Sequence, residues 1–279
     1  MVPAYLGYFI FAQSQRIGSM RKDQVPDRHV PEPEELVFTI DDEIRDAIIH
    51  TEETFIKQAS DLELICPSFT DYGKKFIRSF QLHPDSYMQT ALQLAYFRLH
   101  GKPCPAFESA TLRQYYHGRT DFVRACNMEV VNWCKAMVDK TVPDEEKKDL
   151  LMAALKKHIQ LMQEAKNMLG CDRHLFGLQV LAQDAGIHVP SIFRDVAYIK
   201  SGGGGDYVLN TSLLGYTQGP PGARAPRVHQ GYSIFYKIQP DRLTYTVSSW
   251  KSCKETSAEK MSASIQQSLR DMRQLVMTS

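Results

Sequence analysis

The segment from Pro84 to His100 constrains the fold most, because apolar residues occupy most of its faces. Proline is tolerated at the first position of a helix, and the acid that follows, Asp85, suits the positive end of the helix dipole. Gly101 then provides a stop signal. Because a helix that is apolar on most sides must be covered on most sides, we expect a buried central helix here.

Other helices and strands are expected around this segment. The helices are predicted at 41–62, from Pro143 to Gly170, and after a capping-box pattern at Thr256 and Glu259. The strands are predicted at 207–214, 232–238 and 243–249, the last two forming a hairpin. Residues 1–13 are expected to form a buried strand and 14–36 a connector. Helices followed by strands and a closing helix indicate an α/β fold, with a sheet covered by helices.

The composition argues against several classes of protein. A net charge of +1 gives no indication of a nucleic-acid surface. No apolar run reaches about 18 residues, so we expect no transmembrane segment. The six cysteines lack the C-x-x-C spacing of metal sites, which favours reduced thiols, an intracellular location and no metal. The last residues, Val276 to Ser279, are not a peroxisomal signal of the S-K-L type.

A basic segment precedes the central helix. Lys74, Lys75 and Arg78 place three cations within five residues. Such a cluster beside a helix start can bind phosphate. A solvated basic face explains the same charges, so both interpretations stay open on the charge pattern alone.

Four further motifs carry hydroxyl, acidic or basic groups. They are Phe107-Glu108-Ser109-Ala110, Gly118-Arg119-Thr120-Asp121, Asp172-Arg173-His174 and Asn210-Thr211-Ser212. An arginine can hold a carboxylate, since two parallel N–H donors match two oxygens. Alone, however, Arg173 is better explained by a surface or ion-paired arginine, and the last motif by polar residues of a strand.

Together and in this order, the motifs resemble those of the carnitine/choline acyltransferase family, which has Tyr-Glu-Ser/Thr-Ala, Gly-Arg-Thr and Ser-Thr-Ser. The medium-chain (octanoyl) branch also resembles this chain at 201–205, Ser-Gly-Gly-Gly-Gly. The resemblance covers most firmly residues 30–279 and only the second part of the family's length. It implies the CoA-dependent acyltransferase fold, a mixed β-sheet covered by helices. Residues 1–36 would be the remnant strand and connector of an upstream domain, and 37–279 the second, C-terminal domain.

The resemblance also assigns roles to residues. It implies coenzyme A binding by Lys74, Arg78 and Asp85. It implies carnitine binding by Phe107, Ser109, Thr120 and Arg173, and the arginine favours carnitine over choline, which has no carboxylate. Phe107 replaces the family's tyrosine, and loss of one hydrogen bond to a charged group costs about 1.5–3 kcal/mol. A core aromatic is therefore as good an interpretation of Phe107 as a ligand contact.

Two residues are expected near the acyl group. Ser212 would donate a hydrogen bond near the developing oxyanion, and such a donor is worth about 3–4 kcal/mol. Gly222 falls near the position of a bulky gate residue in the short-chain branch, so a glycine there would leave room for a longer acyl chain.

The family's catalytic base is a histidine followed by x-x-x-(Asp/Glu)-Gly. Among nine histidines only His117 has this spacing, but Phe122 stands where the glycine belongs. The Gly118 motif also already matches another family segment. Counting back from 30–36, which matches a segment downstream of the true histidine, places that histidine just before Met1. We therefore expect this chain to lack the base.

These inferences predict a medium-chain carnitine O-acyltransferase that moves an acyl group between coenzyme A and carnitine. The implied partners are acyl-CoA and carnitine as substrates, with no cofactor, and an upstream domain or full-length subunit. The resemblance suggests the peroxisome. Two alternatives stay open: a non-catalytic truncated product that binds coenzyme A or pairs with a subunit, and a soluble α/β protein without assignable activity.

Overall fold

The computed structural model describes residues 32, 34–214 and 222–278, and the chain falls into two compact units, Met1–Lys57 and Gln58–Ser279. The predicted strand at 1–13 and most of the predicted connector lie outside the described residues. Helix α2 (Asp42–Asp61) confirms the helix expected at 41–62, and none of its residues is buried.

The second unit contains a mixed sheet, as the α/β prediction requires. Its strands are β1 (Leu62–Ile65), β2 (Ser68–Phe69), β3 (Ala106–Thr111), β4 (Thr120–Arg124), β5 (Leu209–Leu213), β6 (Tyr232–Ile238) and β7 (Leu243–Trp250), in the order β1-β7-β6-β5-β3-β4 with β2 on β7. Strand β5 runs parallel to both β3 and β6, and the other pairs are antiparallel. The hairpin of β6 and β7 is confirmed.

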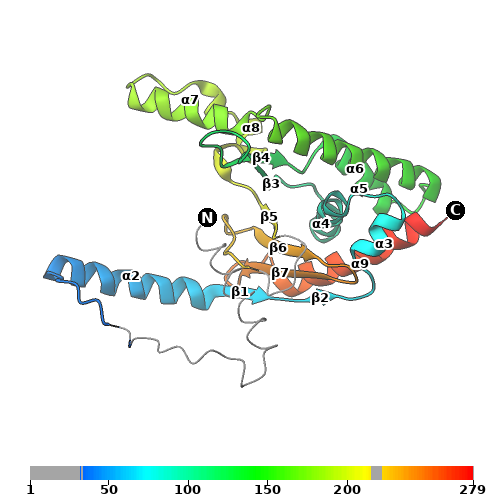
Figure 1. Ribbon diagram of the computed structural model, residues 1–279. Helices are drawn as coiled ribbons and strands as arrows, with labels where there is room; N and C mark the ends of the chain where they lie inside the picture. The colour runs from blue at the N-terminus through cyan, green and yellow to red at the C-terminus, as the bar shows by residue number, and fades with distance from the viewer. Residues whose placement is uncertain (1–31, 33, 215–221, 279) are drawn as a thin grey trace. The chain divides into compact units, whose positions relative to one another are not determined.

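Helices α4 (Pro84–His100), α5 (Met128–Val138), α6 (Asp144–Lys166) and α9 (Ala258–Met277) lie on one face of this sheet (Figure 1). Helix α7 (Asp172–Asp184) contacts β4 on the other face, where Asp172 pairs with Arg124. The remaining helices are α3 (Lys74–Ser79), η2 (Ser191–Arg194), α8 (Val196–Lys200) and η3 (Gly203–Gly205). Figure 1 shows α4 between the sheet and α5 and α6.

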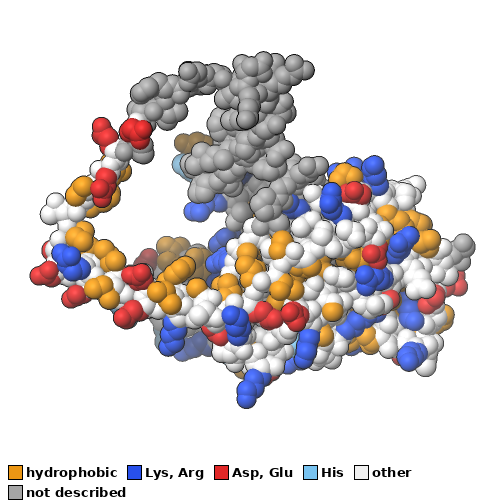
Figure 2. Space-filling view, turned by 90° about the horizontal axis from the view of Figure 1, so that it is seen from below, with side chains coloured by type: hydrophobic (Ala, Val, Ile, Leu, Met, Phe, Trp, Pro, Cys, Tyr) orange, Lys and Arg blue, Asp and Glu red, His pale blue; other side chains and the backbone are white. Residues whose placement is uncertain are grey.

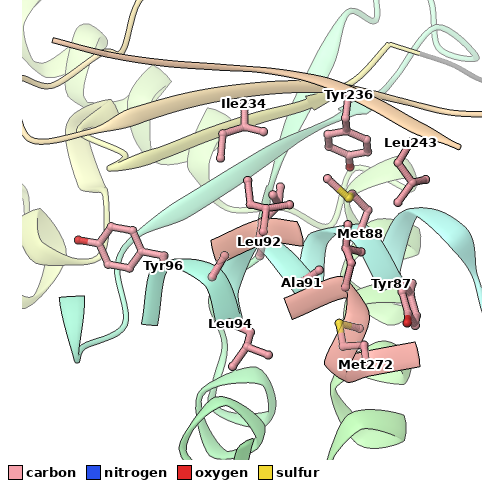
Figure 3. Close-up of a cluster of buried hydrophobic side chains, with 14 of the residues drawn as sticks. Tyr87, Met88, Ala91, Leu92, Leu94, Tyr96, Ile234, Tyr236, Leu243 and Met272 are labelled. Atoms are coloured by element: carbon pink, nitrogen blue, oxygen red, sulfur yellow. The ribbon is translucent and has the colours of Figure 1, made fainter. Parts of the chain in front are cut away.

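Helix α4 is the predicted central helix, with the expected bounds. The backbone N–H of Ser86 donates to the His83 side chain at its start, and Gly101 ends it with φ 67°, a left-handed conformation that favours glycine. Every residue from Pro84 to Phe97 is buried. In Figure 3 its side chains Met88 and Leu92 lie between the sheet residues Ile234 and Tyr236 and the α9 residue Met272, which explains the apolar pattern all round the helix.

Alternation along the strands divides the functional motifs between two faces. Register pairs Phe107 with Asn210 and Asn210 with Ser233, while Ser212 pairs with Phe235. Because side chains alternate across a strand, Phe107, Ser109, Asn210 and Ser212 share one face. The residues between them, such as Glu108 and Thr211, point to the face that carries α4.

Several predicted boundaries were wrong. The helix after Pro143 ends at Lys166 rather than Gly170, and Met168 has φ 60° in the turn that follows. The closing helix is capped by Ser257, whose hydroxyl accepts from the Lys260 backbone N–H at 3.4 Å, so the capping box at Thr256 was placed one residue early. The strand expected at 207–214 spans only Leu209–Leu213. Strands β1 to β4 were not predicted.

The surface of the described residues matches the balanced composition. Figure 2 shows Lys and Arg side chains intermixed with Asp and Glu across its visible, described part. None of the helices in that part of the chain is long and apolar enough to cross a membrane.

Candidate active site

Two hollows in the second unit contain three of the predicted site residues, Asp85, Ser109 and Arg173. We call the first the acid hollow, of about 360 Å³. It is lined by His83, Asp85, Ser86, Glu108, Ser109, Ala110, Thr111, His158, Ile159, Met162, Gln163, Lys166 and Leu213. We call the second the arginine hollow, of about 170 Å³. It is lined by Phe122, Asp172, Arg173, Phe176, Gln179, Tyr198, Gly202, Gly204, Gly205, Tyr207 and Arg227.

The acid hollow opens where β3 and β5 separate. The two strands pair only at Ala106↔Leu209 and Phe107↔Asn210. The residues that follow on each strand, Ser109 and Leu213, line the hollow instead of continuing the ladder. The separation therefore leaves the β3 side of β5 open beside Ser212.

Two buried acids form the floor of this hollow. Asp85 is 4% and Glu108 2% exposed. The Tyr236 hydroxyl donates to Asp85 Oδ1 at 2.6 Å and lies 3.4 Å from Glu108 Oε1. Burial, reinforced by the charge of Glu108, raises the pKa of Asp85 to about 7, and burial raises the pKa of Glu108 to about 7 as well. The acid pair therefore changes its charge near neutral pH.

A hydrogen-bonded chain joins these acids to the Asn210-Thr211-Ser212 motif. Gln89 Nε2 donates to the Tyr236 hydroxyl at 2.8 Å and to Thr211 Oγ1 at 3.0 Å. The Thr211 hydroxyl donates to the Phe107 carbonyl oxygen at 2.8 Å. Thr211 thus fixes β5 against β3 and α4, while Asn210 and Ser212 point to the other face.

His158 completes the network from α6. Its Nε2 lies 3.1 Å from Glu108 Oε2 and its Nδ1 lies 2.9 Å from the Ser86 hydroxyl. Burial lowers the pKa of His158, so the ring is neutral near pH 7. Its contact with Glu108 is then a hydrogen bond and not an ion pair. Because both ring nitrogens are engaged, this histidine presents no free nitrogen as a general base.

The predicted phosphate cations lie apart from the two hollows. Lys74 begins α3 half-buried, and its backbone N–H donates to the Gln239 carbonyl oxygen at 2.8 Å. Arg78 is exposed on the same short helix. Within the acid hollow the cation is Lys166, which is half-buried at the end of α6. Sequence reasoning missed Lys166 because it belongs to an ordinary charged helix.

Phe107 lies in an aromatic cluster. It is 6% exposed, and its ring centre lies 4.9 Å from that of Phe122 and 4.7 Å from that of Tyr207. These contacts are those of a core aromatic, which was one of the two interpretations from sequence.

The arginine hollow brings together two residues expected to hold a carboxylate. Arg173 on α7 donates from Nε to the Thr120 carbonyl oxygen at 3.2 Å and from Nη2 to the Thr120 hydroxyl at 3.3 Å. Its guanidinium carbon lies 4.4 Å from the centre of the Phe122 ring, which orients the plane of the group. Among the described residues no carboxylate pairs with Arg173, so its charge remains available to a ligand.

The carboxylate in this hollow is already engaged. Asp172 accepts from Arg124 Nη2 at 2.7 Å and from Arg124 Nε at 3.1 Å, a two-pronged ion pair that ties α7 to β4. The Tyr207 hydroxyl also donates to Asp172 at 3.2 Å. The sequence motif Asp172-Arg173 therefore combines one internally paired charge with one unpaired charge.

Ser212 and Gly222 lie on the face of the sheet away from α4. Ser212 is half-buried and pairs in register with Phe235. A Cβ added to Gly222 would lie 3.3 Å from Leu214 Cδ1 and 3.9 Å from the Phe235 ring. The Gly222 carbonyl oxygen accepts from the Thr246 hydroxyl at 2.8 Å, which holds this part of the loop over the strand beside Ser212.

His117 lies outside both hollows. It is exposed in the β3–β4 turn with φ 58°, and its ring contacts that of Tyr116. That His117 is not the base stays a prediction. In the described part of the chain, no group of three or more His, Cys, Asp or Glu is arranged to hold a metal ion.

The chain is similar to known proteins along most of its length. The family model for "Choline/Carnitine o-acyltransferase" matches residues 5–267. The peroxisomal carnitine O-octanoyltransferase of Bos taurus is 45% identical over 89% of this chain. The carnitine O-acetyltransferase of Mus musculus and the choline O-acetyltransferase of Sus scrofa are 34% and 33% identical, each over 92% of it. The chain spans about 40% of the length of each of these relatives.

Proposed function

This chain belongs to the choline/carnitine O-acyltransferase family, and from that membership we propose that it supplies the coenzyme A and carnitine sites of a medium-chain carnitine O-acyltransferase. The observation that carries the proposal is Arg173. Its guanidinium is positioned by Thr120 and Phe122 and lacks a carboxylate partner among the described residues. Such a group suits carnitine, which has a carboxylate, better than choline, which has none.

The acid hollow is the proposed site for the acyl-CoA arm. It contains Asp85 and Ser109, two residues that the resemblance implicates, together with the cation Lys166. Lys74 and Arg78 lie on α3 outside this hollow and would contact the nucleotide phosphates. Leu213 lines this hollow, and the thioester carbonyl would sit beside the residue before it, Ser212.

The reaction follows from this placement. The hydroxyl oxygen of carnitine attacks the thioester carbonyl carbon, and a base removes the hydroxyl proton. The negative charge develops on the carbonyl oxygen, where Ser212 would donate a hydrogen bond. Collapse of the intermediate breaks the C–S bond and releases coenzyme A as a thiolate, which regains a proton. No residue of this chain is assigned as the base.

A preference for medium acyl chains is supported by two observations. Identity is 45% to the bovine octanoyltransferase and 34% to the murine acetyltransferase. In addition, Gly222 places only hydrogen over Phe235 on the face that carries Ser212. The peroxisomal location of the octanoyltransferase relatives leads us to propose the same compartment for this protein.

A non-catalytic chain that binds coenzyme A or pairs with a subunit is the second candidate. Two observations favour it: both nitrogens of His158 are engaged, and His117 lies outside the hollows. The experiment that separates the two is thiol release from octanoyl-CoA by the purified chain, with and without carnitine, beside calorimetric binding of both ligands. Carnitine-dependent release supports the enzyme; binding without release supports the second candidate. Binding of neither ligand would overturn both.

A further inference from the structure

The glycine run at 201–205 has a structural role in the arginine hollow. A Cβ on Gly202 would overlap the Tyr207 ring, and a Cβ on Gly203 would overlap the Tyr198 ring. A Cβ on Gly205 would lie 3.0 Å from Nη2 of Arg227. Three side chains that line the hollow, those of Tyr198, Tyr207 and Arg227, therefore lie so close to a glycine that a larger residue would contact them.

The position of Arg227 is fixed by its neighbours along the chain. Pro226 before it is buried, and after it the Gly231 backbone N–H donates to the Val228 carbonyl oxygen at 3.1 Å in the turn that leads into β6. The backbone that carries Arg227 is thus restrained on both sides, and Nη2 of its side chain lies beside Gly205.

The charge of Arg227 is not matched inside the hollow. The carboxylate that lines the hollow, Asp172, is occupied by Arg124. Within the described residues, Arg227 makes no hydrogen bond or ion pair. The hollow is therefore lined by two guanidinium groups, those of Arg173 and Arg227, that have no carboxylate partner among the described residues.

We propose that Arg227 is a second carboxylate-binding residue, which acts with Arg173 to select a zwitterionic amino alcohol over one without a carboxylate. This inference rests on the proposed function and deepens it. A carboxylate has two oxygens, and two guanidinium groups supply more N–H donors and more positive charge than Arg173 alone. The same two charges repel a ligand such as choline, which is only cationic.

The first test is calorimetric binding of L-carnitine and of choline to the 279-residue chain and to Arg227→Ala. Carnitine should bind about 10- to 100-fold more weakly to the variant, while choline affinity stays the same or rises. The carnitine affinity of Arg227→Lys should lie between those of the unmodified chain and Arg227→Ala, because lysine keeps the positive charge but lacks the paired N–H donors of a guanidinium. Arg224→Ala is the matched control, since Arg224 is exposed in the same segment and does not line the hollow.

A second test moves the guanidinium without removing it. Gly204 and Gly205 both have positive φ, 78° and 96°, so alanine strains the backbone at either site. At Gly204 the added Cβ meets nothing within 4 Å, whereas at Gly205 it meets Arg227. Gly205→Ala should weaken carnitine binding several-fold more than Gly204→Ala.

The outcomes distinguish this inference from the proposed function. If Arg173→Ala loses carnitine binding and Arg227→Ala does not, Arg227 has no role in recognition and the proposed function stands. If Arg227→Ala weakens carnitine and choline equally, its role is structural and the inference is wrong. If the unmodified chain does not bind carnitine, both are wrong.

Discussion

The two hollows are built in opposite ways. In the acid hollow, the lining residues Asp85, Glu108 and His158 lie within the core, where His158 bonds to Glu108 and the buried Tyr236 donates to Asp85. In the arginine hollow, α7 has no buried residue, and Arg173 and Arg227 lack carboxylate partners among the described residues. This difference separates two kinds of group. Buried side chains that bond to one another stabilise the fold, whereas unpaired charges on an exposed surface are available to bind a ligand.

The largest effect should come from the exposed side of this comparison. Arg173→Ala should reduce carnitine affinity by about 10- to 100-fold, since a charge-assisted hydrogen bond is worth about 1.5–3 kcal/mol. The free energy of unfolding should change by less than about 0.5 kcal/mol, as for most surface substitutions. Calorimetry and urea denaturation measure the two, with the exposed Arg119→Ala as control. If Arg173→Ala strongly lowered the free energy of unfolding and left carnitine affinity intact, Arg173 would be a structural residue and not a binding residue.

Substitutions in the buried network of the acid hollow should lower stability. Tyr236→Phe removes a hydroxyl that donates to Asp85 and accepts from Gln89, leaving buried polar groups unpaired. We expect a loss of about 1–3 kcal/mol in the free energy of unfolding, measured by urea denaturation. Tyr116→Phe, at a site 92% exposed, should leave stability unchanged. An equally small effect of both variants would show that the network contributes little.

The pH dependence of stability sharpens the assignment of the acid pair. The pKa values of Asp85 and Glu108 are raised in the folded state, so the folded chain binds more protons than the unfolded chain between about pH 4 and 7. These groups therefore remove stability as pH rises through that window. The lowered pKa of His158 acts in the opposite sense, since it removes stability as pH falls below its ordinary value.

Glu108→Gln tests how much the ionisation of Glu108 contributes to the pH dependence of stability. Relative to the unmodified chain, this variant should gain about 1–2 kcal/mol between pH 5 and 8, because no charge develops at this position and Asp85 loses a repulsive neighbour. Urea denaturation at each pH measures the difference, and Glu52→Gln on the exposed helix α2 is the control. A difference that does not vary with pH would mean that Glu108 titrates as it does in the unfolded chain.

The smallest effect concerns the acyl group. Gly222→Leu should weaken octanoyl-CoA relative to acetyl-CoA by up to about tenfold, because its side chain would occupy space beside Leu214 and Phe235. Competition binding of the two thioesters measures the ratio, with Ala223→Leu as the control in the same exposed segment. A ratio that is equal in both variants would remove Gly222 from the acyl pocket.

Sequence predicted best what depends on local pattern. The bounds of α4 follow from Pro84 and Gly101, and the hairpin of β6 and β7 follows from alternation, so both were confirmed. Strands β3 and β4 were missed because Glu108 and Asp121 are buried acids, which break the apolar signal of a strand. The burial of Glu108 depends on partners distant in sequence, His158 of α6 and Asp85 of α4.

The candidate site divides in the same way. Motifs located Asp85, Thr120 and Arg173, and the structure places each of them at or beside a hollow. Sequence did not indicate His158 or Arg227, since each is a single residue in an unremarkable segment. Their positions depend on tertiary contacts: His158 reaches Glu108 across the core, and Arg227 rests on Gly205.

We propose that the two hollows bind two different substrates at once. Calorimetric titration of L-carnitine into the chain already saturated with coenzyme A tests this. We expect one carnitine bound per chain, with an affinity that Arg173→Ala reduces. Exclusion of carnitine by coenzyme A, or carnitine binding that ignores Arg173, would contradict it.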